Sequence, residues 1–391
     1  MEKRVIAFLV LSVLVIVGYN FFLDQMGWLS QSEVVTVSPT AEPSTANSPT
    51  PASTRGSASQ NPGLATEVPP VGHLPSEGSG DAGSGAAAQA EETIEVSTDL
   101  YRAVLTNHGA DIKSWELKRY TTSPTEEGKP IQLVHQEGKF RRPLGVTVSD
   151  VAVSKALTDG LYKVERDFTT LNANHPTGHV TFSYQLPDRP IRLEKQMTFH
   201  YNSYLVDIAI KAEGVTGPVD VGLGTNFGVV DWGEGFIGLL GPAVMVDEKL
   251  VREMPDAEQE HKGAIRWVGL QDKYFISVLI PKGATSAVVK KEGEKLASVG
   301  ARFAVPAEGA ALSLQLYAGP KEFDTLLALN VGLEDAIDFG WFIYGSWDVV
   351  RAVAKPLFSV LRFINDFTHN YGIAIVLLTM SLKLLFVPLQ Y

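Results

Sequence analysis

Cysteine is absent from this chain of 391 residues. Without thiols the chain holds no disulfide, no thiolate-bound metal and no cysteine nucleophile. The absence does not locate the protein, because cysteine-free chains occur in every compartment. It does mean that an exported domain of this chain folds on its hydrophobic core alone, without disulfide crosslinks.

Grouped positive charge is lacking as well. The formal net charge is −11, and the lysines and arginines form no dense cluster. Phosphate contacts need clustered cations, so the composition weighs against a nucleic-acid partner.

The common catalytic motifs are also missing. The sequence has no G-x-S-x-G, H-E-x-x-H, P-loop or EF-hand pattern. The glycines of GLGTNFG at 222–228 are spaced one residue too far apart for G-x-G-x-x-G, and a turn in a sheet explains them better. His175 and His179 are separated by a proline and a glycine, which disfavour a shared helical face. We therefore expect no enzyme, no cofactor and no metal, although a cleft built from distant strands stays open.

Residues 31–90 contain no phenylalanine, tyrosine or tryptophan and are rich in serine, threonine, proline, alanine and glycine. Such a segment buries too little apolar surface to offset the entropy of ordering. We predict a disordered tether.

A long hydrophobic run stands before the tether, in residues 1–30. No residue from Val5 to Leu23 is charged. The length of this run is close to the roughly 20 residues that cross a bilayer. Lys3 and Arg4 precede the run, so the positive-inside rule places the N-terminus in the cytoplasm. A cleaved signal peptide is the alternative, but no small-x-small cleavage site follows. We expect an uncleaved anchor.

The sequence pattern from residue 91 to 320 is typical of β-strands. Two apolar runs flank Asn107-His108-Gly109, which indicates a hairpin. In 191–200, Ile191, Leu193, Met197 and Phe199 share one strand face, and the polar residues Arg192, Glu194, Gln196 and His200 share the other. Many such strands predict a large antiparallel sandwich with a few helical inserts, for example at DEKLVREM, residues 247–254.

The pattern becomes helical in residues 321–370. KEFDTLLAL predicts a short helix, and a longer amphipathic helix follows. Its apolar face carries Leu357, Val360, Leu361, Ile364 and Phe367, and its polar face carries Lys355, Ser359, Arg362 and Asp366. We expect this helix to lie in a membrane interface, with packing on the sandwich as the alternative.

Residues 371–391 are predicted to form a second transmembrane helix. Its apolar run contains Lys383, about 16 Å beyond Gly372 at about 1.5 Å per residue, near the middle of a hydrocarbon core of about 30 Å. A lysine at that depth costs about 2.5–3.5 kcal/mol, so it is either functional or snorkelling towards the interface. The functional alternative is a wet cavity in which Lys383 receives polar parts of a passenger.

Several stretches resemble one family. LYAGPKEFD resembles its L-Y-x-G-P-K strand end, and IDFGWF resembles its D-Y-G-W stretch, with Phe339 for the tyrosine. The run from KPLF to FVPL at 355–389 resembles its interfacial helix and second span, and WVGLQDKYFISVLIP resembles a buried part of its periplasmic domain. Together with the order of segments, these residues resemble the Gram-negative YidC membrane protein insertases, tightly after Tyr317.

The resemblance implies a mainly β fold, namely a mutarotase-like periplasmic β-supersandwich flanked by transmembrane helices, with a C-terminal amphipathic interfacial helix. It implies an inner-membrane, multi-pass protein with residues 31–370 in the periplasm. Its partners are nascent inner-membrane proteins and the lipid bilayer, and the Sec translocase is left open. Lys383 matches the family's basic groove residue, which is usually arginine, and is the one substrate-binding residue expected.

The family continues for four more spans beyond the equivalent of Pro388. We therefore expect residues 371–391 to be a truncated start of the insertase core. Two other functions are carried forward. One is a membrane-anchored periplasmic scaffold or binding module for translocase partners, and the other is an anchored carbohydrate-active enzyme.

Overall fold

The computed structural model describes residues 88, 90–123, 128–135, 141–230, 241–294, 296–305, 310–337 and 348–390. All of them belong to the second of two compact units, Gly80–Tyr391. The anchor predicted at 1–30 and nearly all of the tether predicted at 31–90 lie outside the described residues.

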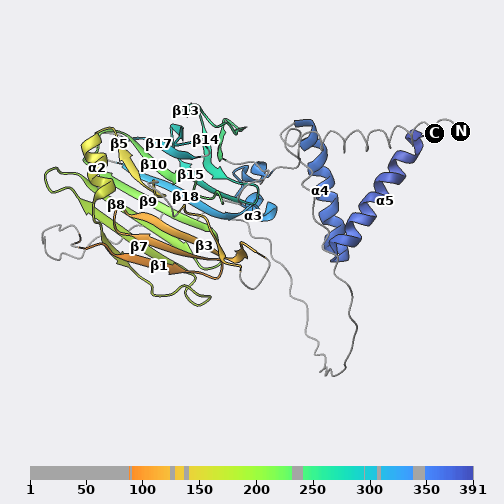
Figure 1. Cartoon of the computed structure of the whole chain (residues 1–391), viewed down its shortest axis with the longest axis horizontal. Helices are drawn as coiled ribbons and strands as arrows, with labels where there is room; N and C mark the ends of the chain where they lie inside the picture. Colours follow the sequence, from red (N-terminus) through yellow and green to blue (C-terminus); the bar gives the residue numbers. More distant parts are fainter. Residues whose placement is uncertain are drawn as a thin grey trace, which may run out of the picture. The chain divides into compact units, whose positions relative to one another are not determined.

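Antiparallel strands build the part of the chain called the β-domain here, from Thr93 to Pro320 (Figure 1). Within the described residues they form three sheets. The first has the order β1 (Thr93–Ser97), β2 (Tyr101–Thr106), β3 (Asp111–Thr121), β4 (Pro130–Gln132). The second has the order β13 (Glu258–Lys262), β16 (Ser286–Lys291), β17 (Ala297–Val305), β10 (Gly217–Thr225), β5 (Val146–Val148). The third and largest has the order β12 (Lys249–Val251), β11 (Gly241–Val246), β14 (Ile265–Gln271), β15 (Phe275–Lys282), β18 (Ala310–Pro320), β9 (Leu205–Glu213), β8 (Arg192–His200), β7 (Thr177–Gln185), β6 (Lys163–Arg166).

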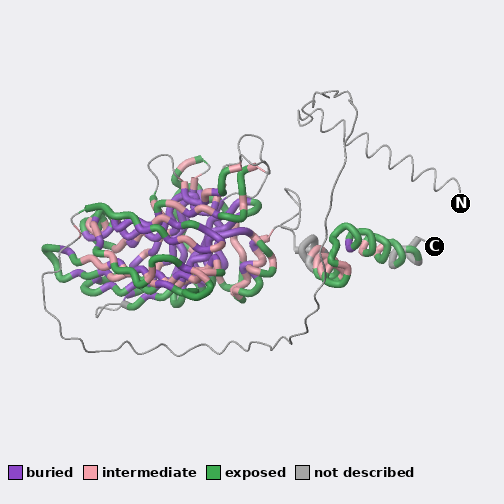
Figure 2. Tube along the Cα trace, turned by 90° about the horizontal axis from the view of Figure 1, so that it is seen from below, coloured by how far each residue is buried: buried purple, intermediate pink, exposed green. Residues whose placement is uncertain are grey.

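The core lies between the large sheet and the two smaller ones. The second sheet packs on β11, β14 and β15, and the first approaches β8 and β9 on the other half. Figure 2 shows the buried residues gathered in this interior. Tyr101 and Trp115 stack there with ring centroids 4.1 Å apart, and Phe227 meets Trp115 edge-on. The mainly β sandwich expected from the sequence is therefore confirmed for this part of the chain.

Strand alternation follows the sequence pattern. Leu193, Met197 and Phe199 on β8 are buried, and the hairpin predicted at Asn107-His108-Gly109 joins β2 to β3. The helical insert predicted at DEKLVREM is wrong. Asp247 and Glu248 both have positive φ and form the two-residue turn of the β11–β12 hairpin. A segment that short nucleates a helix poorly in water, and pairing with β11 satisfies its backbone instead.

Helix α2 (Val151–Asp159) is an insert that the sequence analysis did not predict. The Asp150 carboxylate caps it by accepting hydrogen bonds from the backbone N–H groups of Ala152 and Val153. Ser154 ties the helix to the edge strand β5 through both backbone groups of Val148. The other edge strands are β1, β4, β6, β12 and β13, and all six have three to five residues.

Helices follow the last strand. The short helix predicted in 321–329 is confirmed as α3 (Phe323–Ala328), and the 3-10 turn η1 (Leu333–Ala336) comes after it. The amphipathic helix is α4 (Asp348–Thr368), which contains Pro356, and α5 (Tyr371–Gln390) follows after two residues.

One charged pair is enclosed in the core. Lys195 on β8 is fully buried, and its ammonium group donates to the carbonyl oxygens of Ala110 at 2.8 Å and Leu144 at 2.6 Å. Asp111, at the start of β3, is buried beside it and interacts with it electrostatically. Burial raises the pKa of Asp111 to about 7 and lowers the pKa of Lys195 to about 8.

These opposite pKa shifts predict that the contribution of the pair to stability passes through a minimum near neutral pH. On the acid side, Asp111 keeps its proton in the folded state, whereas the same carboxyl group, with a pKa of 3.8 in the unfolded chain, has released it. The contribution of Asp111 to the free energy of unfolding therefore falls as pH rises towards 7. On the alkaline side, Lys195 loses its proton in the folded state, whereas the same amine, with a pKa of 10.5 in the unfolded chain, keeps it. The contribution of Lys195 to the free energy of unfolding therefore rises from pH 8 upward.

The minimum is best measured as a difference in urea unfolding free energy between the parent β-domain and a Lys195→Met/Asp111→Asn variant across this pH range. The difference profile should show the dip. A flat profile would contradict the assigned ionisation of the pair.

Candidate functional site

The candidate site is the helical segment α3–α5 together with the surface of the β-domain that α3 covers. Lys383, the one substrate-binding residue expected from the sequence, lies in α5 and is exposed. In the described part of the chain no carboxylate is within ion-pair distance of it.

Helix α5 begins with a capped N-terminus. The Asn370 side-chain oxygen accepts hydrogen bonds from the N–H groups of Gly372 and Ile373. Inside the helix, Thr379 and Ser381 donate their hydroxyls to carbonyls one turn earlier, so their polarity is satisfied within the helix. Exposed apolar side chains occupy several faces of the helix: Ile373, Ile375, Val376, Leu377, Met380, Leu384 and Val387. This distribution is typical of a helix in an apolar environment.

No helix within the described residues combines the length and the hydropathy that crossing a membrane requires. The transmembrane helices expected to flank the β-domain are therefore not shown.

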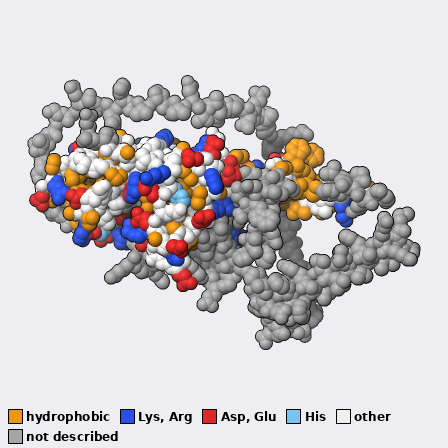
Figure 3. Space-filling model, turned by 90° about the horizontal axis from the view of Figure 1, so that it is seen from above, with side chains coloured by type: hydrophobic (Ala, Val, Ile, Leu, Met, Phe, Trp, Pro, Cys, Tyr) orange, Lys and Arg blue, Asp and Glu red, His pale blue; other side chains and the backbone are white. Residues whose placement is uncertain are grey.

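Helix α4 exposes one strongly hydrophobic strip. The side chains of Phe363 and Phe367 are 76% and 88% exposed, and Val360 is also exposed. In Figure 3 hydrophobic side chains gather on the described part of this helical segment, whereas charged and hydrophobic groups are interspersed over the visible surface of the β-domain. An exposed aromatic strip of this kind favours contact with an apolar partner or a lipid surface.

Polar contacts fix the start of α3 on the β-domain. The Tyr120 hydroxyl donates to the Glu322 carboxylate at 2.5 Å, and the Lys321 ammonium donates to the side-chain oxygen of Gln271 at 2.6 Å. Leu326, on the inner face of α3, is fully buried. The α3 segment is therefore part of the β-domain's rigid surface.

Two shallow hollows flank Glu322, with volumes of about 320 and 220 Å³. Tyr120 and Phe275 line the larger one, and Arg119 and Tyr204 line the smaller one. Burial raises the pKa of Tyr204 to about 12, and burial and the bond to Glu322 also raise the pKa of Tyr120. Both phenols therefore stay protonated at neutral pH and act as hydrogen-bonding groups rather than bases.

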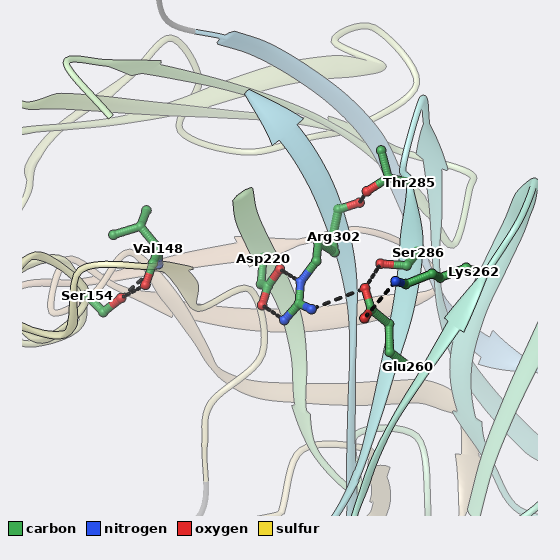
Figure 4. Close-up of polar contacts among 8 residues, drawn as sticks. All are labelled: Val148, Ser154, Asp220, Glu260, Lys262, Thr285, Ser286 and Arg302. Atoms are coloured by element: carbon green, nitrogen blue, oxygen red, sulfur yellow. Dashed lines mark hydrogen bonds and ion pairs between the residues drawn. The ribbon is translucent and has the colours of Figure 1, made fainter. Parts of the chain in front are cut away.

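A second polar cluster crosses the sheet that contains β17 (Figure 4). The Arg302 guanidinium binds both oxygens of Asp220 at 2.7 and 2.8 Å and lies 3.2 Å from Glu260. Ser286 donates to the same Glu260 carboxylate, and these contacts raise the pKa of Arg302 and lower the pKa of Glu260. The charged groups pair with one another across four strands. Such an arrangement is typical of a structural ion-pair network rather than of acid–base catalysis.

The two histidines considered in the sequence do not come together as a site. His179, on β7, pairs with Asp167 at 2.6 Å, whereas His175 closes a tight turn with Asn172. The glycines of 222–228 fall at the end of β10, where the strand pairing is irregular and Gly224 has positive φ.

Sequence reasoning missed the contact between α3 and α4. The Arg362 side chain reaches Asp324 and lies near the rings of Phe323 and Phe358. The i,i+4 spacing of Phe358 and Arg362 was a visible signal for a shared helix face, but nothing in the sequence named α3 as its partner.

Taken together, a large antiparallel β-sandwich followed by an amphipathic helix and then an apolar helix defines the class of protein, a β-domain joined to a helical segment. The family model of the YidC periplasmic domain matches residues 93–360. The chain belongs to the YidC family of membrane protein insertases, as the sequence resemblance predicted.

Curated relatives agree along the whole chain. The membrane protein insertase YidC of Syntrophus aciditrophicus is 30% identical, and the alignment covers 100% of this chain and 70% of that relative. The insertase of Oleidesulfovibrio alaskensis is 28% identical, with 100% and 68% covered.

Solved structures give a weaker likeness. A galactose mutarotase related enzyme from Lactobacillus acidophilus is 11% identical with a TM-score of 0.39, covering 58% of this chain and 97% of that one. A galactose mutarotase-like protein from Lactobacillus casei is 10% identical with a TM-score of 0.39, covering 58% and 100%.

Proposed function

We propose that this chain acts in the bacterial inner membrane, where α5 enters the bilayer and Lys383 offers positive charge to incoming membrane proteins. The observation that carries the proposal is α5 itself. It is a helix of 20 residues, apolar on several faces, with Lys383 as its one charged residue. A lysine in such a place is favourable only beside water or a polar partner, which gives it a role in receiving polar segments.

The layout that we propose has five parts: an N-terminal anchor at 1–30, a tether at 31–90, a periplasmic β-domain at 91–320, a helical segment at 321–370 and a second transmembrane helix at 371–391. The uncharged run from Val5 to Leu23 after Lys3 and Arg4 supports a cytoplasmic N-terminus. The exposed aromatic strip of α4 supports its placement in the periplasmic interface.

The passengers that we propose are nascent inner-membrane proteins, with the lipid bilayer as the second partner. A passenger's apolar segment leaves water through the lipid beside α4 and α5, while its polar tail stays partly solvated near Lys383. Solvation of the tail lowers the cost of moving polar groups across hydrocarbon. We also propose the Sec translocase as a partner, because it would handle the same passengers, and co-purification from crosslinked membranes tests this.

The Lys383→Glu variant of the full natural protein is expected to insert passengers with acidic translocated tails at least about fivefold more slowly. Unit charges about 4 Å apart interact by about 1–4 kcal/mol at effective dielectrics of about 80 to 20, and about 1 kcal/mol already changes a ratio about fivefold. The measurement is protease protection of the tail in reconstituted vesicles.

The matched control is Lys383→Arg, which keeps the charge and should keep the rate. A passenger with a neutral tail is the second control and should respond less to Lys383→Glu. Equal insertion of the acidic tail by parent and Lys383→Glu would rule out this role for Lys383.

We also propose that the β-domain is not a catalyst. The charged groups of the Arg302 cluster are occupied by their own hydrogen bonds, and so is a second cluster, in which His200 and Gln315 both bind the Asp207 carboxylate. An epimerisation assay with the isolated β-domain and common aldoses tests this, and turnover above that of buffer would favour the carbohydrate-active alternative.

A further inference from the structure

Four groups form a compact contact between α3 and α4, called the clasp here. The Arg362 guanidinium lies 2.6 Å from the Asp324 carboxylate. Its central carbon is 5.5 Å from the ring centre of Phe323 and 6.0 Å from that of Phe358. The two rings meet edge-on, with centres 5.3 Å apart. One cation therefore bridges a carboxylate and two aromatic rings.

One half of the clasp belongs to a fixed surface. Phe323 and Asp324 open α3, directly after Lys321 and Glu322, whose side chains bind Gln271 and Tyr120 of the β-domain. Movement of Phe323 away from the sandwich would break these bonds. The clasp therefore holds α4 against a support that does not readily yield.

The other half lies on one side of α4. Phe358 and Arg362 are four residues apart and share a helix face. Phe363 and Phe367 are also four residues apart, and at about 100° per residue Phe363 lies about 140° around the axis from Phe358. The first pair meets α3, whereas the second pair is exposed. The two faces of α4 thus have different partners.

We propose that the clasp fixes the rotation of α4 about its own axis, so that the β-domain sets which face of α4 meets the membrane. This inference rests on the proposed placement of α4 in the interface. The held face carries Phe358 and Arg362, and the face left free carries Phe363 and Phe367. The β-domain thereby acts as a positioning element for the helix that borders the insertion site.

The clasp is expected to be strong enough to favour one rotation of α4 about its axis and weak enough to open. A cation–π contact at a partly exposed site shifts an equilibrium by roughly 2- to 5-fold. Loss of Arg362 removes two such contacts and one ion pair, which gives a shift of about tenfold towards open states. A passenger or lipid that binds α4 from the side of α3 would compete with it.

The test measures the distance between α3 and α4 in the full chain, reconstituted in lipid nanodiscs. Because the chain has no cysteine, Leu327→Cys and Asp366→Cys place two spin labels without background. Both positions are exposed, one turn beyond Phe323 and Arg362 respectively. Double electron–electron resonance should give one narrow distance distribution in this labelled parent.

Arg362→Gln in the labelled parent should add a second, broader population. The matched control is Phe363→Ala, on the same helix but outside the clasp, which should leave the distribution narrow. The charge swap Asp324→Arg with Arg362→Asp should restore more of the narrow population than either single change. An unchanged distribution in Arg362→Gln, or equal broadening in Phe363→Ala, would overturn the clasp.

This outcome is independent of passenger insertion. A broadened distribution in Arg362→Gln supports the clasp even if Lys383→Glu inserts normally, in which case the proposed role of Lys383 fails alone. Accessibility of a single label at position 363 to a lipid-soluble relaxing agent then checks the placement of α4. High accessibility in the parent and a fall in Arg362→Gln support rotational control, and equal accessibility in both contradicts it.

Discussion

Replacing Lys195 with methionine is expected to lower the free energy of unfolding of the β-domain by about 3–5 kcal/mol. The change removes two hydrogen bonds to backbone carbonyls and leaves Asp111 buried without its cation. Domains of ordinary stability have about 5–15 kcal/mol in total, so the loss is a large fraction. Urea unfolding followed by tryptophan fluorescence should show a midpoint lower by about 1 M or more.

Two further variants separate the pair from a general effect of losing a lysine. Lys195→Met/Asp111→Asn removes both charges and should recover part of the loss, because asparagine needs no cation, whereas the carbonyls of Ala110 and Leu144 still lack the Lys195 donor. Lys211→Met changes a lysine on the neighbouring strand β9 that faces solvent beside Glu194, and it should cost at most about 1 kcal/mol. If the double variant is no more stable than Lys195→Met, the two charges are not coupled.

Replacing Trp115 with alanine is expected to cost about 3–5 kcal/mol as well. Its side chain is fully buried, stacked on Tyr101 and in edge contact with Phe227. Tyr101 in turn contacts Tyr204, which packs edge-on against Tyr317, and Tyr317 binds the carbonyl of Pro320 just before α3. The cavity should therefore loosen the support of α3 as well as the core, which amide hydrogen exchange of α3 will report.

Trp115→Phe is the informative companion. Within the described residues the Trp115 indole N–H has no hydrogen-bond partner, so phenylalanine loses volume but no bond. It should cost less than half as much as alanine. Tyr274→Ala, at a ring that is 47% exposed, should cost about 1 kcal/mol or less. A cost for Trp115→Ala no larger than for Tyr274→Ala would contradict the central place of the stacked rings.

The mainly β fold could be predicted from the alternation of apolar and polar residues, because one buried face imposes a period of two along each strand. Residues of β8 and β9 illustrate this, since Leu193, Met197, Val206 and Ile208 are all buried as their spacing indicates. Sheet order was not predictable in the same way. The pairing of β10 with β17, and of β9 with β18, joins strands far apart in the chain, and local pattern holds no record of such partners.

Lys195 shows that the alternation held information that the sequence analysis did not use. It stands between Leu193 and Met197 on the buried face, so its position was available from the spacing. Lysine is almost never fully buried unless paired, and its partner Asp111 comes from another sheet. The candidate site divides in the same manner. Lys383 could be proposed from the sequence because a charge interrupts an apolar run, whereas Asp324 and Arg362 lie on different helices and are joined only by the fold.

The six short strands at the sheet edges matter for an insertase family, whose members work close to unfolded chains. Long unpaired edges act as templates on which an extended segment of another protein can add as a further strand. Here β4 begins with Pro130, β6 reads KVER, β13 reads EQEHK, and none of the described edges exceeds five residues. Along the described edges an unfolded passenger therefore meets little free strand backbone, which disfavours its capture by strand addition.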